Sequence, residues 1–419
     1  MIVEIINTGS EIMLGRVLNT HQQWLCAQLA ALGYVVNRQV AVPDSAADIQ
    51  NAIAESLTRS QLVICTGGLG PTSDDLTRDM VAKLLGKELR EDPSVTAHIK
   101  LFFDARKRPM PELTHVQAQV PEGATVLHNA HGTAPGLVLK VNPNCFHPES
   151  LPALLIMLPG PPRELRPMFL DSVVPLLKRE LPLESGFVCV TLRTAGIGES
   201  IVQEKIHGSL IELVKAGLDV GYCARPWQVD IRLSARGGTA RTLVENAERL
   251  VRQELGRNIY SSEDEELSGV IVNALSSRKH TLVLAESCTG GFIANQLTNV
   301  PGSSAVFLAG IVSYSNESKQ KLLGVQQASL DQHGAVSQEV ARQMAEGGKN
   351  LFRADYGLAV TGIAGPSGGT LEKPVGTVFI ALAGPSETVV HHHLNPYDRE
   401  TFKMVTCQQA LELLRRKLI

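Results

Sequence analysis

The strongest constraint on the fold of this 419-residue chain is its alternation of short apolar runs with segments of helical periodicity. The first runs, at residues 1–8, 34–42 and 61–66, are typical of strands, and residues 19–32 and 45–59 carry apolar side chains at helical spacing. Strands that alternate with helices build a mainly parallel sheet with helices on both faces. We therefore predict an α/β fold, in which ligands bind beyond the carboxyl ends of the strands.

The length of the chain predicts two or three domains, because one core rarely serves 419 residues. We expect one α/β domain at residues 1–170 and another at residues 261–419. Between them, residues 171–260 show the strand-like and helical segments of a small α+β domain. The acidic stretch Ser261-Ser-Glu-Asp-Glu-Glu266 is the expected linker to the last domain.

Composition limits the classes of function. Aromatic residues make up 4% and the formal net charge is −3, which argues against a base-stacking surface and a general attraction to phosphate backbones. We therefore expect small-molecule partners and no nucleic acid. The seven cysteines are odd in number and never spaced Cys-x-x-Cys, so we expect reduced thiols and a cytoplasmic protein. Glu4 and the absence of a basic stretch predict a first strand instead of a signal peptide, and no apolar run suits a membrane span.

A glycine-rich loop follows the third predicted strand. It has the sequence Gly67-Gly68-Leu69-Gly70-Pro71-Thr72-Ser73-Asp74-Asp75, and a helical pattern follows it. Glycines let backbone N–H groups approach a phosphate, the hydroxyls add donors, and the paired carboxylates can hold a divalent cation on pyrophosphate oxygens. Asp74 and Asp75 also suit the first turn of a helix, and both interpretations stay open. Neither the P-loop spacing nor Gly-x-Gly-x-x-Gly is met.

Two further loops rich in glycine and proline lie at strand ends, at residues 131–136 and 159–164. Such residues usually form simple turns. Their recurrence at several strand ends favours a shared rim that binds a ligand.

These motifs resemble the molybdopterin-binding-like domain of the CinA (competence/damage-inducible) family. The resemblance rests on Thr8-Gly9-Ser10-Glu11, on the loop 67–75, on Gly132-Thr-Ala-Pro-Gly136 and on Leu158-Pro-Gly-Pro-Pro162. In that family the domain is linked to hydrolysis of ADP-ribose-type pyrophosphates with a divalent metal, and the same fold binds molybdopterin. The resemblance implies a metal (Mg, Mn or Co) at Asp74 and Asp75. It implies a substrate site that includes Gly9, Glu11, Gly67, Gly68, Gly70, Thr72 and Ser73.

The middle segment resembles the KH-type domain of full-length family members. KH modules that bind RNA clamp its backbone with a Gly-x-x-Gly loop and basic flanks. The nearest counterpart here, Gly196-Ile-Gly198, is followed by the acidic Glu199. We therefore expect this segment to act as a spacer or to support a homodimer.

The last domain places a serine where a predicted strand breaks into a glycine turn. Residues 281–285 are strand-like, and Glu286-Ser-Cys-Thr-Gly-Gly291 leads into a helical pattern. Ser287 near a helix N-terminus suits chemistry in which negative charge develops, although a simple N-cap is the commoner role of a serine at this position. A serine nucleophile needs a base, and a lysine in an apolar pocket can serve because burial lowers its pKa. Lys319 is a candidate, although a solvated helix position is the commoner role of such a lysine.

Other strand ends of this domain carry residues suited to a nucleotide. Gly362-Ile-Ala-Gly365 and the glycines after it follow the strand at residues 356–360 and can close over a ligand. Arg399 suits a phosphate, whereas a surface ion pair with Asp398 is the simpler interpretation. The run 391–393 of three histidines cannot converge on one metal ion, because neighbours in a strand point to opposite faces.

The segments 285–291, 314–319, 362–366 and 373–377 closely resemble the carboxy-terminal domain of the CinA family, the nicotinamide mononucleotide (NMN) deamidase fold. That resemblance implies Ser287 as nucleophile and Lys319 as base, with Tyr314 nearby and Arg399 on the nucleotide phosphate. It implies further substrate-binding residues in the turn and the loop, namely Thr289, Gly290, Gly291, Gly362 and Gly365. Two departures from the family pattern are Ser367, where an acidic residue is common, and Pro396-Tyr397, where a small residue is usual before Asp398.

We therefore expect a hydrolase of pyridine-nucleotide metabolism. Its C-terminal domain would deamidate NMN without a cofactor, and its N-terminal domain would hydrolyse ADP-ribose with a divalent metal. Cys288 is a rival nucleophile, because thiolates attack carbonyls well. Two other functions stay open: a protein that is mainly a dinucleotide pyrophosphatase, and a non-catalytic pterin- or nucleotide-binding protein linked to competence or DNA damage.

Overall fold

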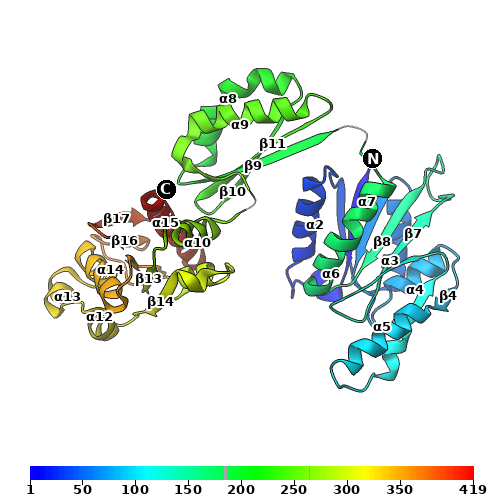
Figure 1. The fold of residues 1–419 in the computed structure, drawn as a ribbon, viewed down its shortest axis with the longest axis horizontal. Helices are drawn as coiled ribbons and strands as arrows, with labels where there is room; N and C mark the ends of the chain where they lie inside the picture. The colour runs from blue at the N-terminus through cyan, green and yellow to red at the C-terminus, as the bar shows by residue number, and fades with distance from the viewer. Residues whose placement is uncertain (184–185, 264) are drawn as a thin grey trace. The chain divides into compact units, whose positions relative to one another are not determined.

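A computed structural model describes residues 1–183, 186–263 and 265–419. The chain divides into two compact units, residues 1–185 and 186–419 (Figure 1). The predicted fold class is confirmed: a three-layer α/β fold comes first, a small α+β fold follows it, and an α/β fold ends the chain. One residue of the predicted linker, Asp264, lies outside the described residues.

The first unit is built on a six-stranded sheet in the order β2-β1-β3-β8-β7-β6. Strands β2, β1, β3 and β8 are mutually parallel, and β7 runs antiparallel to both of its neighbours. The N-terminal end of β7 therefore lies at the same edge as the carboxyl ends of the parallel strands. The strands are β1 (Val3–Thr8), β2 (Arg38–Val42), β3 (Leu62–Thr66), β6 (Thr125–Leu127), β7 (Gly136–Val141) and β8 (Ala153–Leu158), with a separate pair β4 (Leu89–Glu91) and β5 (Gln119–Pro121).

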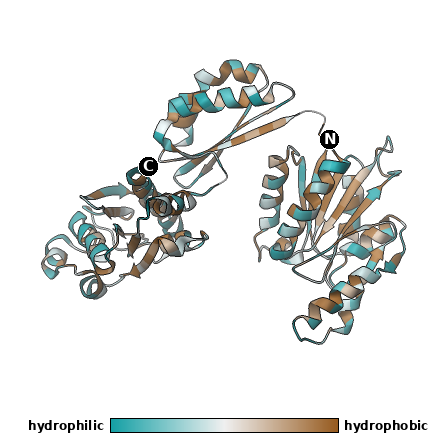
Figure 2. Cartoon of the chain, in the orientation of Figure 1, coloured by the Kyte–Doolittle hydropathy of each residue, from teal (hydrophilic) through white to brown (hydrophobic). Residues whose placement is uncertain are grey.

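Helices cover both faces of this sheet, as predicted. Alternate residues of one strand face opposite cores: Ile64 belongs to the core shared with α2, α6 and α7, and Val63 and Cys65 to the core shared with α3, α4 and α5. Figure 2 shows the matching pattern, with hydrophobic colouring along the strands. The helices are α1 (Ser10–Met13), α2 (Thr20–Ala31), α3 (Ala46–Leu57), α4 (Thr77–Leu84), α5 (Pro93–Asp104), α6 (Pro162–Met168) and α7 (Val174–Glu180), with η1 (Glu112–Ala118) and η2 (Phe169–Val173).

Two predicted bounds in this unit differ from the structure. The second strand begins at Arg38 and not at residue 34, because the Tyr34 hydroxyl turns inward and donates to the carbonyls of Leu177 and Leu181 at 3.2 and 3.0 Å. The predicted boundary at residue 170 falls inside η2. The first unit continues through α7, because Leu176 and Leu177 are buried in its core.

The middle fold, at the start of the second unit, is a four-stranded antiparallel sheet in the order β10-β11-β9-β12. Helices α8 and α9 contribute Ile206 and Val244 to one core with Ile231 and Leu233 of the sheet. The elements are β9 (Phe187–Ala195), α8 (Glu199–Lys215), β10 (Asp219–Arg225), β11 (Gln228–Arg236), α9 (Ala240–Leu255), η3 (Gly256–Asn258) and β12 (Ile259–Ser261).

The last fold is a five-stranded sheet in the order β14-β13-β15-β16-β17. The second strand in this order, β13, is parallel to both of its neighbours, so its carboxyl end opens beside those of β14 and β15. One core lies against α10, α11 and α15, and the other against α12, α13 and α14. The elements are α10 (Leu267–Arg278), β13 (Leu282–Glu286), α11 (Phe292–Thr298), η4 (Ser303–Ala305), β14 (Phe307–Val312), α12 (Asn316–Leu323), α13 (Gln327–His333), α14 (Gln338–Phe352), β15 (Tyr356–Gly362), β16 (Thr377–Ala383), β17 (Thr388–Leu394) and α15 (Arg399–Leu418).

No helix in the described part of the chain combines the length and the apolar character that crossing a bilayer requires.

Two adjacent glycines in α14 differ in how closely their surroundings approach. A Cβ added at Gly347 would lie 1.8 Å from the Leu323 carbonyl oxygen, at the end of α12, whereas one added at Gly348 would lie 3.4 Å from Val283 Cγ1. Only Gly347 therefore lets α14 pack this closely against α12, the helix that carries Lys319.

We predict that Gly347→Ala destabilises the second unit by about 1–3 kcal/mol, because α12 must move away. The matched control Gly348→Ala is neutral or stabilises by up to about 1 kcal/mol, through its better helix propensity. Differential scanning calorimetry of both variants measures the shift. Equal shifts in the two variants would contradict the close-approach argument.

Candidate functional site

Ser287 directly follows the carboxyl end of β13, which pairs with β14 and β15. Its backbone N–H donates to the Val360 carbonyl of β15 at 3.0 Å, which fixes the residue to the sheet. Residues 288–291 then form the turn into α11, and Gly290 and Gly291 adopt φ values of +62° and +92°. These positive φ values suit glycine and let the chain turn directly after Ser287.

Ser287 does not cap the helix, contrary to the simpler sequence interpretation. The N-cap of α11 is Gly291, and the carboxylate of Glu286 accepts the N–H groups at the helix start. Gly291 and Ile293 donate to one oxygen at 3.0 and 3.1 Å, and Ala294 donates to the other at 2.8 Å. The buried Glu286 thus satisfies this helix end, which leaves the Ser287 hydroxyl free for other partners.

Lys319 meets Ser287 in the protein interior. The lysine is 1% exposed, and its Nζ lies 3.1 Å from Ser287 Oγ, 2.7 Å from the Ser313 carbonyl and 3.4 Å from the Tyr314 carbonyl. Ser315 caps α12 with a reciprocal hydrogen bond to Ser318, which fixes the first turn of the helix that carries Lys319. The two side chains therefore come together from segments 32 residues apart.

The surroundings of Lys319 favour a neutral amine. Burial lowers its pKa. A neutral amine has two hydrogens and one lone pair. The two carbonyl oxygens can accept both hydrogens, which leaves the lone pair for the hydroxyl proton of Ser287.

Cys288, the rival nucleophile, is buried and stays protonated. Burial raises the pKa of its thiol to about 12, and Glu286 adds to the shift. The reactive form of a cysteine is the thiolate. At neutral pH the serine beside Lys319 is therefore the better-prepared nucleophile.

Arg399 and Tyr314 form the other side of the same cavity. Arg399 donates to the Gly365 carbonyl at 2.9 Å and to the Tyr314 hydroxyl at 2.8 Å. Asp398 caps α15 by accepting from the backbone N–H groups of Glu400 and Thr401, in place of the surface ion pair considered from the sequence. The cavity has a volume of about 230 Å³. It is lined by Ser287, Cys288, Tyr314, Asn316, Lys319, Ala335, Val336, Thr361, Gly362, Ala364 and Arg399.

The structure thus brings Ser287, Lys319, Tyr314, Arg399 and Gly362 together around one cavity, which we call the serine-lysine site. The other predicted residues do not line the cavity. Gly365 supplies its carbonyl to Arg399, Gly290 and Gly291 shape the turn, and Thr289 is buried. Sequence reasoning missed Asn316, Ala335, Val336 and Thr361; Asn316 and Thr361 lie in stretches already singled out, whereas Ala335 and Val336 carried no pattern.

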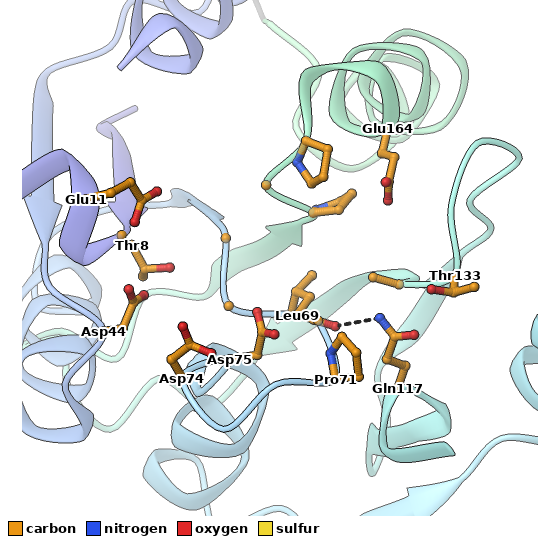
Figure 3. A pocket seen from close by; sticks show the side chains of 18 residues that line it. Thr8, Glu11, Asp44, Leu69, Pro71, Asp74, Asp75, Gln117, Thr133 and Glu164 are labelled. Carbon is orange, nitrogen blue, oxygen red and sulfur yellow. Dashed lines mark hydrogen bonds between the residues drawn. The ribbon is translucent and has the colours of Figure 1, made fainter. Parts of the chain in front are cut away.

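The first unit holds a second cavity, of about 410 Å³, at the carboxyl ends of its parallel strands (Figure 3). We call it the acidic cavity, because five carboxylates line it. These residues are Glu11, Asp44, Asp74, Asp75 and Glu164. Among the described residues, no lysine, arginine or histidine side chain lines it. An anionic ligand would therefore need a cation to enter.

Glycines are required where the loops around this cavity pack most closely. A Cβ at Gly68, where φ is +66°, would lie 2.2 Å from Thr77 Oγ1, and one at Gly70 would lie 2.3 Å from Asp75 Oδ2. A Cβ at Gly132 would lie 2.1 Å from Glu164 Oε2. Gly68 and Gly70 therefore let the loop after β3 fold back on itself, and Gly132 lets the loop before β7 approach Glu164 of α6.

Asp74 and Asp75 precede the helix, since α4 begins at Thr77. Asp75 Oδ2 accepts from the backbone N–H and the hydroxyl of Thr72, at 2.9 and 2.5 Å, and so holds the loop closed. Among the described residues, no group of three or more Asp, Glu, His or Cys is placed to hold a metal. Mg²⁺-like cations are commonly bound by one or two carboxylates together with phosphate oxygens and water, and Asp74 and Asp75 provide such carboxylates at the cavity.

Most predicted residues of this half line the acidic cavity: Gly9, Glu11, Gly67, Gly68, Gly70, Asp74 and Asp75. Thr72 acts through its bonds to Asp75, and Ser73 is exposed outside the lining. Asp44, Gln117 and Glu164 were missed. Asp44 follows a predicted strand and Glu164 lies in a predicted loop, but nothing in the sequence distinguished Gln117.

Known proteins share this succession of folds. Three family models match in order: "Probable molybdopterin binding domain" at residues 4–179, "Damage-inducible protein CinA KH domain" at 190–261 and "CinA C-terminal domain" at 264–418. A putative competence-damage inducible protein of Caldicellulosiruptor bescii is 40% identical over 424 residues, which cover 100% of both chains.

The chain belongs to the CinA family. A CinA-like protein of Akkermansia muciniphila is 43% identical over 410 residues, covering 98% of this chain and 95% of the relative. The crystal structure of the competence/damage inducible protein CihA from Agrobacterium tumefaciens has 40% identity and a TM-score of 0.36, and it covers 38% of this chain and 98% of that one. The three family models confirm the CinA domains that the sequence motifs predicted, including the KH-type middle domain.

Proposed function

We propose that the serine-lysine site of this CinA protein deamidates nicotinamide mononucleotide to nicotinic acid mononucleotide and ammonia. The observation that carries the proposal is the 3.1 Å approach of Lys319 Nζ to Ser287 Oγ in a buried environment that lowers the pKa of the lysine. A hydroxyl that shares a proton with a neutral amine is an activated nucleophile for an amide carbonyl. The resemblance to the NMN deamidase fold supplies the substrate class.

In the proposed reaction, Lys319 takes the proton of Ser287 as Oγ bonds to the carboxamide carbon. The N–H groups of Cys288 and Thr289 donate to no backbone carbonyl among the described residues, and they lie beside Ser287 to stabilise the oxyanion. Lys319 returns its proton to the amide nitrogen, so the C–N bond breaks and ammonia leaves. Water then attacks the ester, gives a proton to Lys319 and releases the acid as Ser287 regains its proton.

Arg399 suits the phosphate of the nucleotide. Two of its N–H groups are used by Gly365 and Tyr314, which hold the guanidinium at the cavity. A guanidinium carries five N–H donors, so others remain for a phosphate.

We predict that Ser287→Ala lowers ammonia release from NMN by about a thousandfold or more, as loss of a catalytic nucleophile does in other hydrolases. Cys288→Ala, next in the chain, keeps most of the activity, because its thiol is protonated. A coupled assay for ammonia, with circular dichroism to check folding, compares the two variants. Full activity of the serine variant would refute the assignment.

Lys319→Arg should abolish the activity, because arginine keeps the charge but cannot lose its proton. In the unchanged protein, kcat/KM should rise with pH as Lys319 loses its proton and become constant once the pH exceeds the lysine pKa. The midpoint of the rise should lie below the ordinary lysine pKa of 10.5, because burial lowers the pKa of Lys319. The control Lys321→Arg lies in the same helix, is exposed and should leave the pH profile unchanged. A profile that lacks this rising limb would argue against a lysine base.

A second function is favoured by the charge of the acidic cavity. We propose a metal-dependent pyrophosphatase of the ADP-ribose type in the first unit. A pyrophosphate is anionic, and a cavity lined by carboxylates repels it unless a cation intervenes. When bound by Asp74 and Asp75, a divalent cation would neutralise the charge on the pyrophosphate oxygens. The glycine loop then allows its backbone N–H groups to approach the same oxygens.

We predict that the protein releases AMP from ADP-ribose only with Mg²⁺, Mn²⁺ or Co²⁺ present, and that Asp75→Ala abolishes this release while NMN deamidation continues. Chromatography of the products, with and without a chelator, follows both reactions in one sample. Release of AMP without a divalent metal would contradict the proposal that a cation bound in the acidic cavity is needed for the reaction. Binding without turnover at either site would instead support a nucleotide-binding protein.

A further inference from the structure

Tyr314 is an exposed aromatic residue at the serine-lysine site, and it is held at both of its ends. Its backbone carbonyl lies 3.4 Å from Lys319 Nζ, and its hydroxyl accepts a hydrogen bond from Arg399 at 2.8 Å. Tyr314 lines the cavity and is 62% exposed. In the part of the chain that the structure describes, no aromatic ring or cationic side chain stacks on its ring. The ring therefore remains available to a ligand.

This tyrosine lies between the residues proposed to hold the two ends of the substrate. At one end, Ser287 and Lys319 would act on the carboxamide, and at the other end Arg399 would bind the phosphate. In NMN the pyridinium ring joins these two groups, because it carries the carboxamide directly and the phosphate through the ribose. A molecule that reaches both ends therefore sets its ring beside Tyr314.

The pyridinium ring of NMN carries a fixed positive charge, and the serine-lysine site offers it no carboxylate. Of the described residues that line the cavity, none is aspartate or glutamate, and only Tyr314 is aromatic. Arg399 suits the phosphate but repels a second cation. A cation that leaves water needs another partner, and the negative face of an aromatic ring can provide one. Tyr314 is the lining residue that has such a face.

We propose that Tyr314 selects the oxidised, positively charged form of the nicotinamide ring through a cation–π contact. The proposal rests on the proposed deamidation of NMN, and it adds the charge of the ring as a determinant of binding. Reduced NMN carries the same carboxamide, ribose and phosphate on a neutral dihydropyridine ring. It therefore loses the contact with Tyr314 while it keeps the groups that bind elsewhere.

The test compares the binding of NMN and reduced NMN to the full-length Ser287→Ala variant, in which turnover does not disturb the measurement. Isothermal titration calorimetry in mildly alkaline buffer, in which the reduced ring is stable, gives both dissociation constants. We expect NMN to bind about fivefold tighter, as the strength of a cation–π contact in a partly desolvated site implies. Equal binding, or tighter binding of reduced NMN, would overturn the proposal.

Further substitutions in the same variant assign the preference to the ring of Tyr314. Tyr314→Phe loses the hydrogen bond to Arg399 but keeps the ring, so both ligands should bind more weakly and the preference for NMN should remain. Tyr314→Leu lacks the ring, and the two ligands should bind equally. The matched control Tyr397→Leu removes another exposed tyrosine, two residues before Arg399 and outside the cavity lining, and should keep the preference.

A second substitution covers the case in which Tyr314→Leu does not fold. Pentafluorophenylalanine in place of Tyr314 keeps the shape of an aromatic ring, but its fluorines remove the negative charge from the ring face. The preference for NMN should then disappear, whereas Tyr314→Phe keeps it. A preference that survives in both the leucine and the pentafluorophenylalanine variants would overturn the assignment to Tyr314.

These results separate the role of Tyr314 from the deamidase itself. Equal binding of the two ligands, together with ammonia release from NMN by the unchanged protein, overturns the role of Tyr314 and leaves the deamidase standing. Preferential binding of NMN without ammonia release supports Tyr314 and overturns the deamidase. A protein that binds neither ligand overturns both.

Discussion

The serine-lysine site depends on the burial of one amine. A lysine in water is charged and cannot act as a base at neutral pH, whereas the interior around Lys319 disfavours the charge. Burying a charged group without partners is costly, and here the carbonyls of Ser313 and Tyr314 compensate for lost water in either protonation state. The capping of α12 and the close packing at Gly347 hold the helix that makes this burial possible.

Glu286 solves a related problem on the other side of the nucleophile. A sharp turn from a strand into a short helix leaves several N–H groups without partners, and the buried carboxylate accepts three of them. The Ser287 hydroxyl is thereby relieved of a structural task. The same carboxylate helps to raise the pKa of the Cys288 thiol. Glu286 therefore leaves the Ser287 hydroxyl free and disfavours the reactive thiolate of Cys288.

Both cavities lie at the carboxyl ends of parallel strands, yet they differ in charge. The serine-lysine site holds the cationic side chain of Arg399 and no carboxylate among the described residues that line it, so it suits an anionic nucleotide directly. The acidic cavity holds five carboxylates and suits the same kind of ligand only with a cation. The shared position follows from sheet topology, because the strand ends bring several loops to one edge. The chemistry follows from which side chains those loops carry.

The sequence by itself determined the order of strands and helices, the three folds and the family, because periodicity and strand-end motifs are local properties. It also identified Ser287, Lys319, Arg399 and Asp75 as candidates. The tertiary structure decided that Ser287 lies against Lys319 and does not cap the helix, that Cys288 is buried, and that Gln117 reaches the loop of Leu69. Burial and contacts between distant segments depend on how the whole chain packs, and no local pattern records them.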